Sequence, residues 1–89
     1  MLFGEKEQAV YRYFLDHPGA EVGEKDLCAA LGLTKGMLYR VLVRLEMRGH
    51  LEGKWSVVHR PAAYRMRRYR LTLAGREALR FWPGRVVLS

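Results

Sequence analysis

The stretch that decides the fold is residues 31–49, which read LGLTKGMLYRVLVRLEMRG. Apolar residues recur in it at steps of three and four, which predicts a helix from Thr34 to about Arg48 with one core-facing stripe. Gly32 is expected to end the preceding helix in a left-handed conformation, Thr34 to act as N-cap, and Gly49 to end the helix. The stripe consists of Met37, Leu38, Val41, Leu42 and Leu45.

Two helices and a short strand are expected before this segment. A first helix, about residues 5–17, stops at the pair Pro18-Gly19, and residues 20–22 form a short edge strand. A second helix, residues 24–31, makes a tight helix-turn-helix with the helix that follows it. The core positions expected on these helices are Ala9, Val10, Tyr13 and Phe14 on the first, and Leu27, Ala30 and Leu31 on the second.

After Gly49 the pattern changes to residues typical of strands. Residues 51–58 and 67–73 predict two antiparallel strands, and the charged segment between them, residues 59–66, predicts an exposed wing. Thr72 is expected to cap a last short helix that reaches Trp82. The expected fold class is α+β: a winged helix-turn-helix of three helices with a small antiparallel sheet and a short C-terminal helix, in one domain over residues 1–89.

Charge is distributed unevenly along the chain. The 89 residues carry 16 Lys and Arg against nine Asp and Glu, a formal net charge of +7, and the sequence pI is about 10.1. Residues 1–33 hold three basic and six acidic residues, net −3, whereas residues 34–89 hold thirteen basic and three acidic residues, net +10. The second part is therefore expected to meet a polyanion such as nucleic acid.

The positive charge coincides with the two elements that a winged helix presents to double-stranded DNA. The third helix would enter the major groove, with Arg40 reading guanine and Tyr39 contacting a thymine methyl group or a phosphate, and the hairpin would reach flanking phosphates or the minor groove. Gly36 would allow close approach, and the helix start at Thr34 would hold a phosphate. The candidate DNA-binding residues are Thr34, Lys35, Gly36, Tyr39, Arg40 and Arg44 on the helix, and Lys54, Arg60, Arg65, Arg67 and Arg68 on the hairpin.

Two runs, LYRVLVRLEMRGHLEGKW at 38–55 and RRYRLTLAGREAL at 67–79, resemble the winged-helix core of the PadR-type bacterial transcriptional regulators. This resemblance covers roughly residues 31–79 and implies a ligand-free or effector-responsive repressor that works as a dimer on a palindromic operator. The first helix departs from the family pattern, since it reads EQAVYRYF, and no C-terminal dimerisation extension matches. The matching positions are Leu38, Tyr39, Arg44, Leu45, Glu46, Gly49, Tyr69, Arg70, Leu71, Thr72 and Gly75.

Other chemistries find little support in the sequence. Cys28 is the single cysteine and is expected to be a small core residue, and the histidines are scattered near turns, so no metal or cofactor is expected. There is no nucleophile–base pair or phosphate-binding glycine loop, and we do not expect an enzyme. No segment predicts a membrane span or a signal peptide, and a cytoplasmic, nucleoid-associated protein is expected.

Several alternatives stay open at this stage. In one alternative, the basic face of the third helix is simply a solvated surface. In another, the hairpin arginines protect the edge of the sheet from pairing with other chains. The domain is otherwise a protein-interaction module or an RNA-binding domain. Trp55 and Tyr69 are expected to pack in the core or the wing rather than stack on bases. A homodimer through the first helix and the apolar tail is a further expectation; the tail residues are Phe81, Trp82, Val86, Val87 and Leu88.

Overall fold

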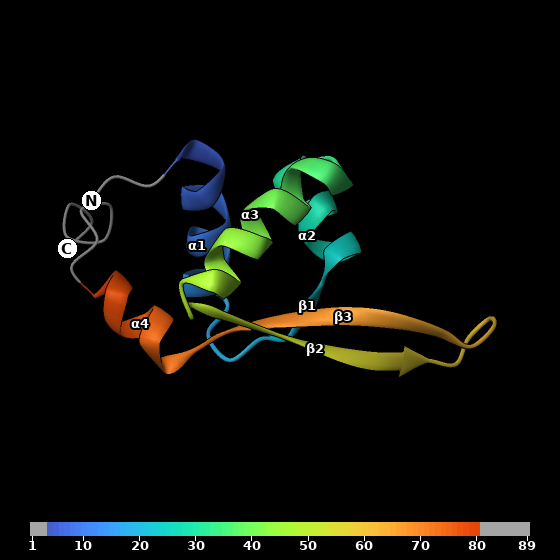
Figure 1. Ribbon diagram of the computed structural model, residues 1–89. Coiled ribbons are helices and arrows are strands. Elements are labelled where there is room, and N and C mark those ends of the chain that lie inside the picture. Colours follow the sequence, from blue (N-terminus) through green and yellow to red (C-terminus); the bar gives the residue numbers. More distant parts are fainter. Residues whose placement is uncertain (1–3, 81–89) are drawn as a thin grey trace.

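Helices α1, α2 and α3 lie on one side of an antiparallel sheet in the computed structural model, which describes residues 4–80 (Figure 1). A helix α4 follows the sheet at the end away from the hairpin tip. This is the predicted α+β class. Over residues 4–80 the elements are α1 (Glu5–Asp16), β1 (Val22–Gly23), α2 (Glu24–Leu31), α3 (Lys35–Met47), β2 (Leu51–Val58), β3 (Tyr64–Leu71) and α4 (Leu73–Leu79).

Helix α3 begins and ends where the local chemistry predicts. The Thr34 Oγ1 atom accepts a hydrogen bond of 3.3 Å from the Met37 backbone N–H, so Thr34 is the N-cap. Gly32 ends α2 with φ of 67°, and Gly49 follows α3 with φ of 78°, both in the left-handed region that glycine tolerates best. These three residues confirm the tight connection between α2 and α3.

The sheet has the strand order β1-β3-β2, and the pairing extends the hairpin further than the sequence predicts. Strand β2 occupies the predicted residues, but β3 begins at Tyr64 and ends at Leu71, so the prediction of residues 67–73 is wrong at both ends. The reason is the ladder: all eight residues of β2 have a partner in β3, from the Leu51–Leu71 pair to the Val58–Tyr64 pair. The turn is therefore residues 59–63 only.

The short strand β1 also differs slightly from expectation, whereas the start of α4 agrees with it. Strand β1 is Val22–Gly23, because Val22 and Gly23 pair with Tyr69 and Arg68 while residues 20 and 21 pair with neither strand. Helix α4 has the predicted cap, since Thr72 Oγ1 accepts from the Gly75 backbone N–H at 2.9 Å. Its predicted end at Trp82 and the apolar tail lie outside the described residues.

The core is built around the α3 stripe, but two predicted core residues, Met37 and Ala30, are exposed. Leu38, Val41, Leu42 and Leu45 are buried, but Met37 is 38% exposed because it lies one residue outside this row, at the edge of the stripe. On α2 Leu27 is buried and Ala30 is exposed. The core members are Val10, Tyr11, Phe14, Val22, Leu27, Leu38, Val41, Leu42, Leu45, Leu51, Tyr69, Leu71 and Leu79.

A charged cluster attaches α1 to the C-terminal end of α3. The Glu7 side chain is 8% exposed and accepts hydrogen bonds from Arg48 Nη1 at 2.8 Å and Arg44 Nη1 at 3.3 Å. Arg48 also donates to the Tyr11 hydroxyl at 3.3 Å, and that hydroxyl shares a 2.6 Å hydrogen bond with His50 Nδ1. These contacts explain why Tyr11, which the sequence analysis did not place in the core, is fully buried.

Two helical glycines should respond in opposite directions to alanine. At Gly75 a Cβ atom would overlap the His50 carbonyl oxygen and lie 2.8 Å from Leu71 Cδ1, so Gly75→Ala should destabilise the fold by about 1–3 kcal/mol. At Gly36 nothing lies within 4 Å, so Gly36→Ala should stabilise it by about 0.5–1 kcal/mol through helix propensity. Thermal and urea unfolding measure both; a stable Gly75→Ala variant would contradict the close packing of α4.

The Glu7 cluster predicts acid sensitivity. Burial raises the pKa of the Glu7 carboxyl, but the hydrogen bonds and charges of Arg48 and Arg44 outweigh it, so the pKa lies below the ordinary value of 4.5. The unfolded chain therefore takes up this proton first, and the stabilisation is complete above pH 4.5 and lost as the pH falls through the lower folded pKa.

Glu7→Gln should lower the free energy of unfolding by about 1–3 kcal/mol at neutral pH and should flatten its decline towards about pH 3. Urea titrations at several pH values measure this change. Glu5→Gln is the matched control, because Glu5 is an exposed carboxylate on the same helix and its loss should cost under about 0.5 kcal/mol. Equal pH profiles for wild type and Glu7→Gln would exclude the proposed stabilisation.

Candidate nucleic-acid interface

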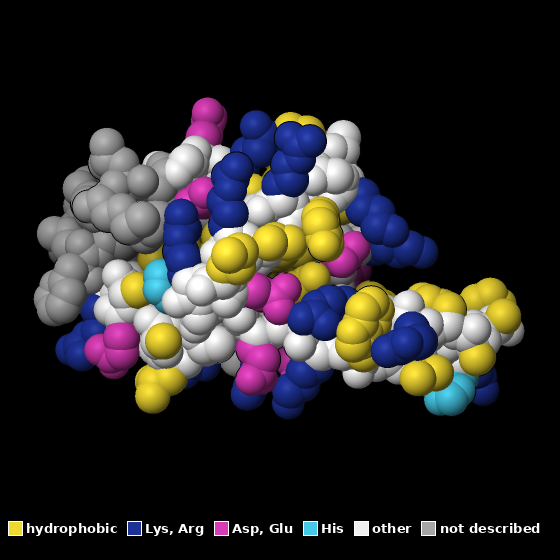
Figure 2. All heavy atoms as spheres, viewed as in Figure 1, with side chains coloured by type: hydrophobic (Ala, Val, Ile, Leu, Met, Phe, Trp, Pro, Cys, Tyr) yellow, Lys and Arg dark blue, Asp and Glu magenta, His cyan; other side chains and the backbone are white. Residues whose placement is uncertain are grey.

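The N-terminal half of α3 presents a continuous cationic and aromatic surface. Lys35, Gly36, Tyr39 and Arg40 are all exposed, and Tyr39 keeps 57% of its surface accessible. Within residues 4–80 no carboxylate lies within ion-pair distance of Lys35 or Arg40. Figure 2 shows basic side chains gathered along α3. The two cations on this half of the helix are thus available to a ligand.

Thr34 and Arg44, at the two ends of this surface, have partners of their own. The Thr34 hydroxyl oxygen caps α3, which leaves its O–H proton for an outside acceptor. Arg44 lies one turn after Arg40, but its Nη1 is 3.3 Å from Glu7 while its side chain stays 60% exposed. Arg44 is therefore an anchored cation at the rim of the surface and is less free to rearrange than Arg40.

The hairpin cations do not share one face. Side chains of a strand alternate between the two faces of a sheet, and Arg67 pairs with Trp55 whereas Arg68 pairs with Lys54. Arg65 and Arg67 thus lie on the face of the buried Tyr69, towards the helices, and Lys54 and Arg68 lie on the opposite face. The expectation of a single basic surface on the hairpin is wrong for Lys54 and Arg68.

Arg67 is engaged by the protein itself. Its Nη2 lies 2.7 Å from Glu46 Oε2 on α3, and its side chain is 27% exposed. The guanidinium lies 5.4 Å from the Trp55 ring centre and 5.7 Å from that of Tyr69. Opposite Tyr69 stands Gly53, where a Cβ atom would come 2.6 Å from Arg67 Nε. Arg67 thus connects the sheet to α3, and its DNA contact stays a prediction.

The outward face of the hairpin carries a partly neutralised set of charges. Glu52 lies 3.9 Å from Lys54 Nζ and 3.0 Å from Arg70 Nη2. Arg68 donates to the Glu21 carbonyl oxygen at 3.3 Å, beside β1. Lys54 and Arg70 on this face thus share one carboxylate, Glu52.

Arg60 and Arg65 complete the predicted set. Arg60 is exposed in the turn at residues 59–63. The Arg65 guanidinium stacks 4.7 Å from the Trp55 ring centre. Trp55 is 57% exposed, so it packs on arginines of the hairpin and not in the core. Its exposure has no signal in the sequence, because it depends on how far the hairpin extends past the helices (Figure 1).

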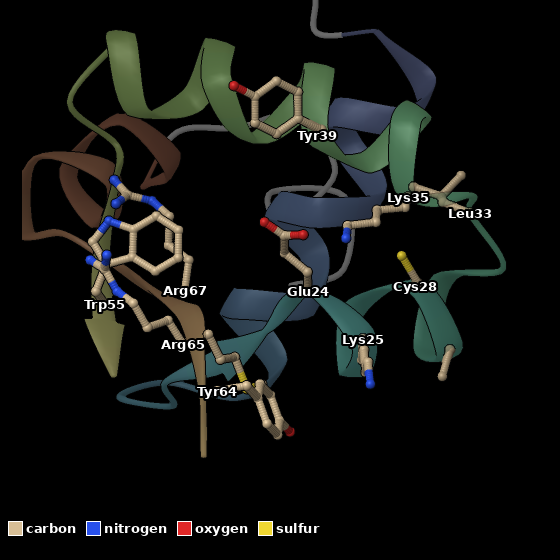
Figure 3. Close-up of a pocket in the computed structure, with 12 residues that line it drawn as sticks. Glu24, Lys25, Cys28, Leu33, Lys35, Tyr39, Trp55, Tyr64, Arg65 and Arg67 are labelled. Carbon is tan, nitrogen blue, oxygen red and sulfur yellow. The ribbon is translucent and has the colours of Figure 1, made fainter. Parts of the chain in front are cut away.

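An open groove of about 920 Å³ separates α3 and α2 from the hairpin. Lys35 and Tyr39 enter it from α3, and Trp55, Arg65 and Arg67 enter it from the hairpin (Figure 3). Three of the predicted DNA-binding cations, Lys35, Arg65 and Arg67, thus line the same groove. Sequence reasoning missed other lining residues that belong to α2 and to the start of β3: Glu24, Lys25 and Tyr64.

Tyr69 is a core residue that contacts two groove-lining residues, Glu24 and Arg67. Burial raises the pKa of its hydroxyl to about 12, with the carboxylates of Glu24 and Glu46 adding to the effect. The hydroxyl therefore stays protonated and donates to Glu24 Oε1 at 3.4 Å. The predicted core role of Tyr69 is confirmed, since it is 1% exposed.

The remaining observations concern metals, membranes and relatives. Across residues 4–80 no three His, Cys, Asp or Glu side chains gather as metal ligands, and Cys28 is a half-buried thiol on the groove wall. None of the helices in this range has the length and apolar character needed to cross a bilayer. Comparison with protein-family models, curated proteins and solved structures finds no match to this chain.

Proposed function

We propose that the chain is a winged-helix domain that binds double-stranded DNA and regulates transcription, as a repressor. The observation that carries the proposal is the exposed side of α3, where Lys35, Tyr39 and Arg40 face outward without a carboxylate partner among residues 4–80. The resemblance of residues 31–79 to PadR-type regulators points the same way and remains a prediction.

The dimensions of α3 suit a major groove. Its 13 residues span about 20 Å at about 1.5 Å per residue, and the groove of B-DNA, about 12 Å wide, admits one α-helix. The order helix, strand, helix, helix, strand, strand agrees with a winged helix, in which the second helix of the helix-turn-helix is the reading helix. Here that helix is α3, and the hairpin β2–β3 is the wing.

Each exposed side chain has a specific task in this arrangement. Arg40 projects from the middle of the exposed row and reads guanine O6 and N7, which is the commonest base contact of arginine. Tyr39 contacts a thymine methyl group or a phosphate, and Lys35 neutralises a phosphate. Of the hairpin cations, Arg65 and Arg60 contact the flanking DNA, because Arg67 is held by Glu46 and Arg68 lies on the outward face.

The alternatives lead to different results in the same assays. A protein-interaction module draws on the exposed hydrophobic residues of the hairpin, Trp55 and Val57, and would show no duplex binding. An RNA-binding domain would prefer single strands or A-form duplexes. A specific operator is found by selection from a random duplex library, and equal affinity for selected and random duplexes would leave only an unspecific binder.

Two arginines on one strand test which side of the hairpin meets DNA. Arg65→Ala should weaken duplex binding about three- to tenfold, and Arg68→Ala, three residues away on the other face, should change it less than twofold. Arg40→Ala should cost about 1–3 kcal/mol and relax the sequence preference at one base pair. Fluorescence anisotropy with labelled duplexes measures all three. If Arg68→Ala lost more duplex affinity than Arg65→Ala, the DNA would lie on the outward face of the hairpin, and the proposed orientation would be wrong.

Salt dependence tests the electrostatic part of the proposal. If about six phosphates are neutralised, the logarithm of affinity should fall against the logarithm of salt concentration with a slope of about −5. Arg65→Ala should reduce the magnitude of this slope by about one, and Arg68→Ala should leave it unchanged. A slope near zero for the wild-type protein would refute binding through phosphates.

Gly36→Ala separates stability from binding. The variant should unfold at a higher temperature than wild type, because the position is helical and open. In the DNA complex the same methyl group would stand between α3 and the duplex, so affinity should fall about three- to tenfold. Weaker binding by a more stable protein cannot come from misfolding. Unchanged affinity would show that α3 does not approach DNA closely at Gly36.

A further inference from the structure

The groove between α3 and the hairpin combines two kinds of wall. Its lining is mostly apolar, and Tyr39 and Trp55 present accessible rings to it, each 57% exposed. Its volume of about 920 Å³ falls in the upper part of the range typical of small-molecule sites. The guanidinium groups of Arg65 and Arg67 lie 4.7 and 5.4 Å from the Trp55 ring centre, and a flat aromatic ring system can stack on the part of the ring that they leave accessible.

Basic side chains enter the groove from both of its walls. Lys35 and Arg65 enter from the helix and from the hairpin, and no carboxylate of residues 4–80 forms an ion pair with either (Figure 3). Arg67 is neutralised by Glu46, which lies outside the lining. Lys25 also lines the groove; its Nζ lies 5.9 Å from the Tyr64 ring centre, and it forms no ion pair within residues 4–80 either. Open cations on both walls favour an anionic ligand, because a phosphate gains a charge-assisted contact on either wall.

Glu24 adds an acceptor to this cationic site. Figure 3 shows its carboxylate pointing into the groove between the two walls. Within the described residues its hydrogen-bond partner is the Tyr69 hydroxyl, at a long 3.4 Å, so most of its lone pairs are open to a ligand. A carboxylate in this position accepts hydrogen bonds from hydroxyl or amino groups.

We propose that the groove binds a free purine nucleotide. The base stacks on Trp55 beside Arg65, the phosphate meets Lys35 on the helix side, and Glu24, between the two walls, accepts from the ribose hydroxyls or the exocyclic amino group. A nucleotide is the class of ligand that uses all three features at once: a planar ring system, an anionic group and hydrogen-bond donors.

Occupancy would also affect DNA binding, a consequence that rests on the proposed function. Lys35 and Tyr39 belong to the groove and to the exposed side of α3 alike. A nucleotide held there occupies the cation and the ring that the duplex needs, so nucleotide and DNA compete for the same protein molecule.

Calorimetric titration of the full chain with adenosine 5′-monophosphate tests the groove without DNA. Binding should be tighter than that of inorganic phosphate or of adenosine by about tenfold or more. Trp55→Ala should weaken it about tenfold and Glu24→Gln about threefold to tenfold. Arg68→Ala, on the outward face, should leave it unchanged, and circular dichroism checks that each variant is folded.

Four results would overturn the proposal, three of them from the nucleotide titrations. These three are binding of the nucleotide no tighter than inorganic phosphate, unchanged binding by a folded Trp55→Ala variant, and an equal loss in Arg68→Ala. Tight, Trp55-dependent binding of a single-stranded oligonucleotide without binding of the free nucleotide would assign the groove to DNA strands and would also overturn it.

A competition arm separates the two proposals. Adding the nucleotide to a labelled duplex complex should release the duplex at concentrations near the calorimetric dissociation constant. If the chain binds no duplex at all, the proposed function fails while the titration still decides the groove. If the duplex binds and a bound nucleotide does not displace it, the predicted overlap at Lys35 and Tyr39 is wrong.

Discussion

Burial of one side of α3 is the constraint on which the rest of this protein depends. Leu38, Leu42 and Leu45 are completely buried against the other elements, and each such side chain contributes about 1.5–3 kcal/mol relative to an exposed one. A helix with one side held in the core can present only its other side to solvent. The outward direction of Lys35 and Arg40 is thus a consequence of packing.

Carboxylates then decide which cations remain open. Glu46 holds Arg67, Glu7 holds Arg44 and Arg48, and Glu52 lies near Lys54 and Arg70. A net charge of +7 therefore does not act as a uniform field. On the helix side its open part is the start of α3 and the facing side of the hairpin, where Lys35, Arg40 and Arg65 form no ion pair within residues 4–80.

The hairpin turns this charge pattern into a shaped surface. Because strand residues alternate in direction, adjacent arginines at 67 and 68 have opposite surroundings: one lies under α3 and the other beside β1. The strut formed by Arg67 and Glu46 connects the hairpin to α3, and the groove lies between the two elements. A ligand in this groove meets both elements that are proposed to touch DNA.

Local chemistry was enough to predict much of the fold. The sequence by itself determined four features, because each depends on residues within a few positions of each other. They are the Thr34 cap, the left-handed Gly32, the break at Gly49 and the span of β2. The same holds for the exposed side of α3, since a helix with one apolar stripe has one outward face.

The tertiary structure alone decided how the hairpin and the distant charges are used. The ion pair between Glu46 and Arg67 joins residues 21 positions apart, and that between Glu7 and Arg44 joins residues 37 positions apart. Strand β3 begins at Tyr64 because β2 offers partners there, and Trp55 is exposed because the hairpin extends past the helices. Such outcomes depend on which surfaces meet in space, and sequence spacing does not record this.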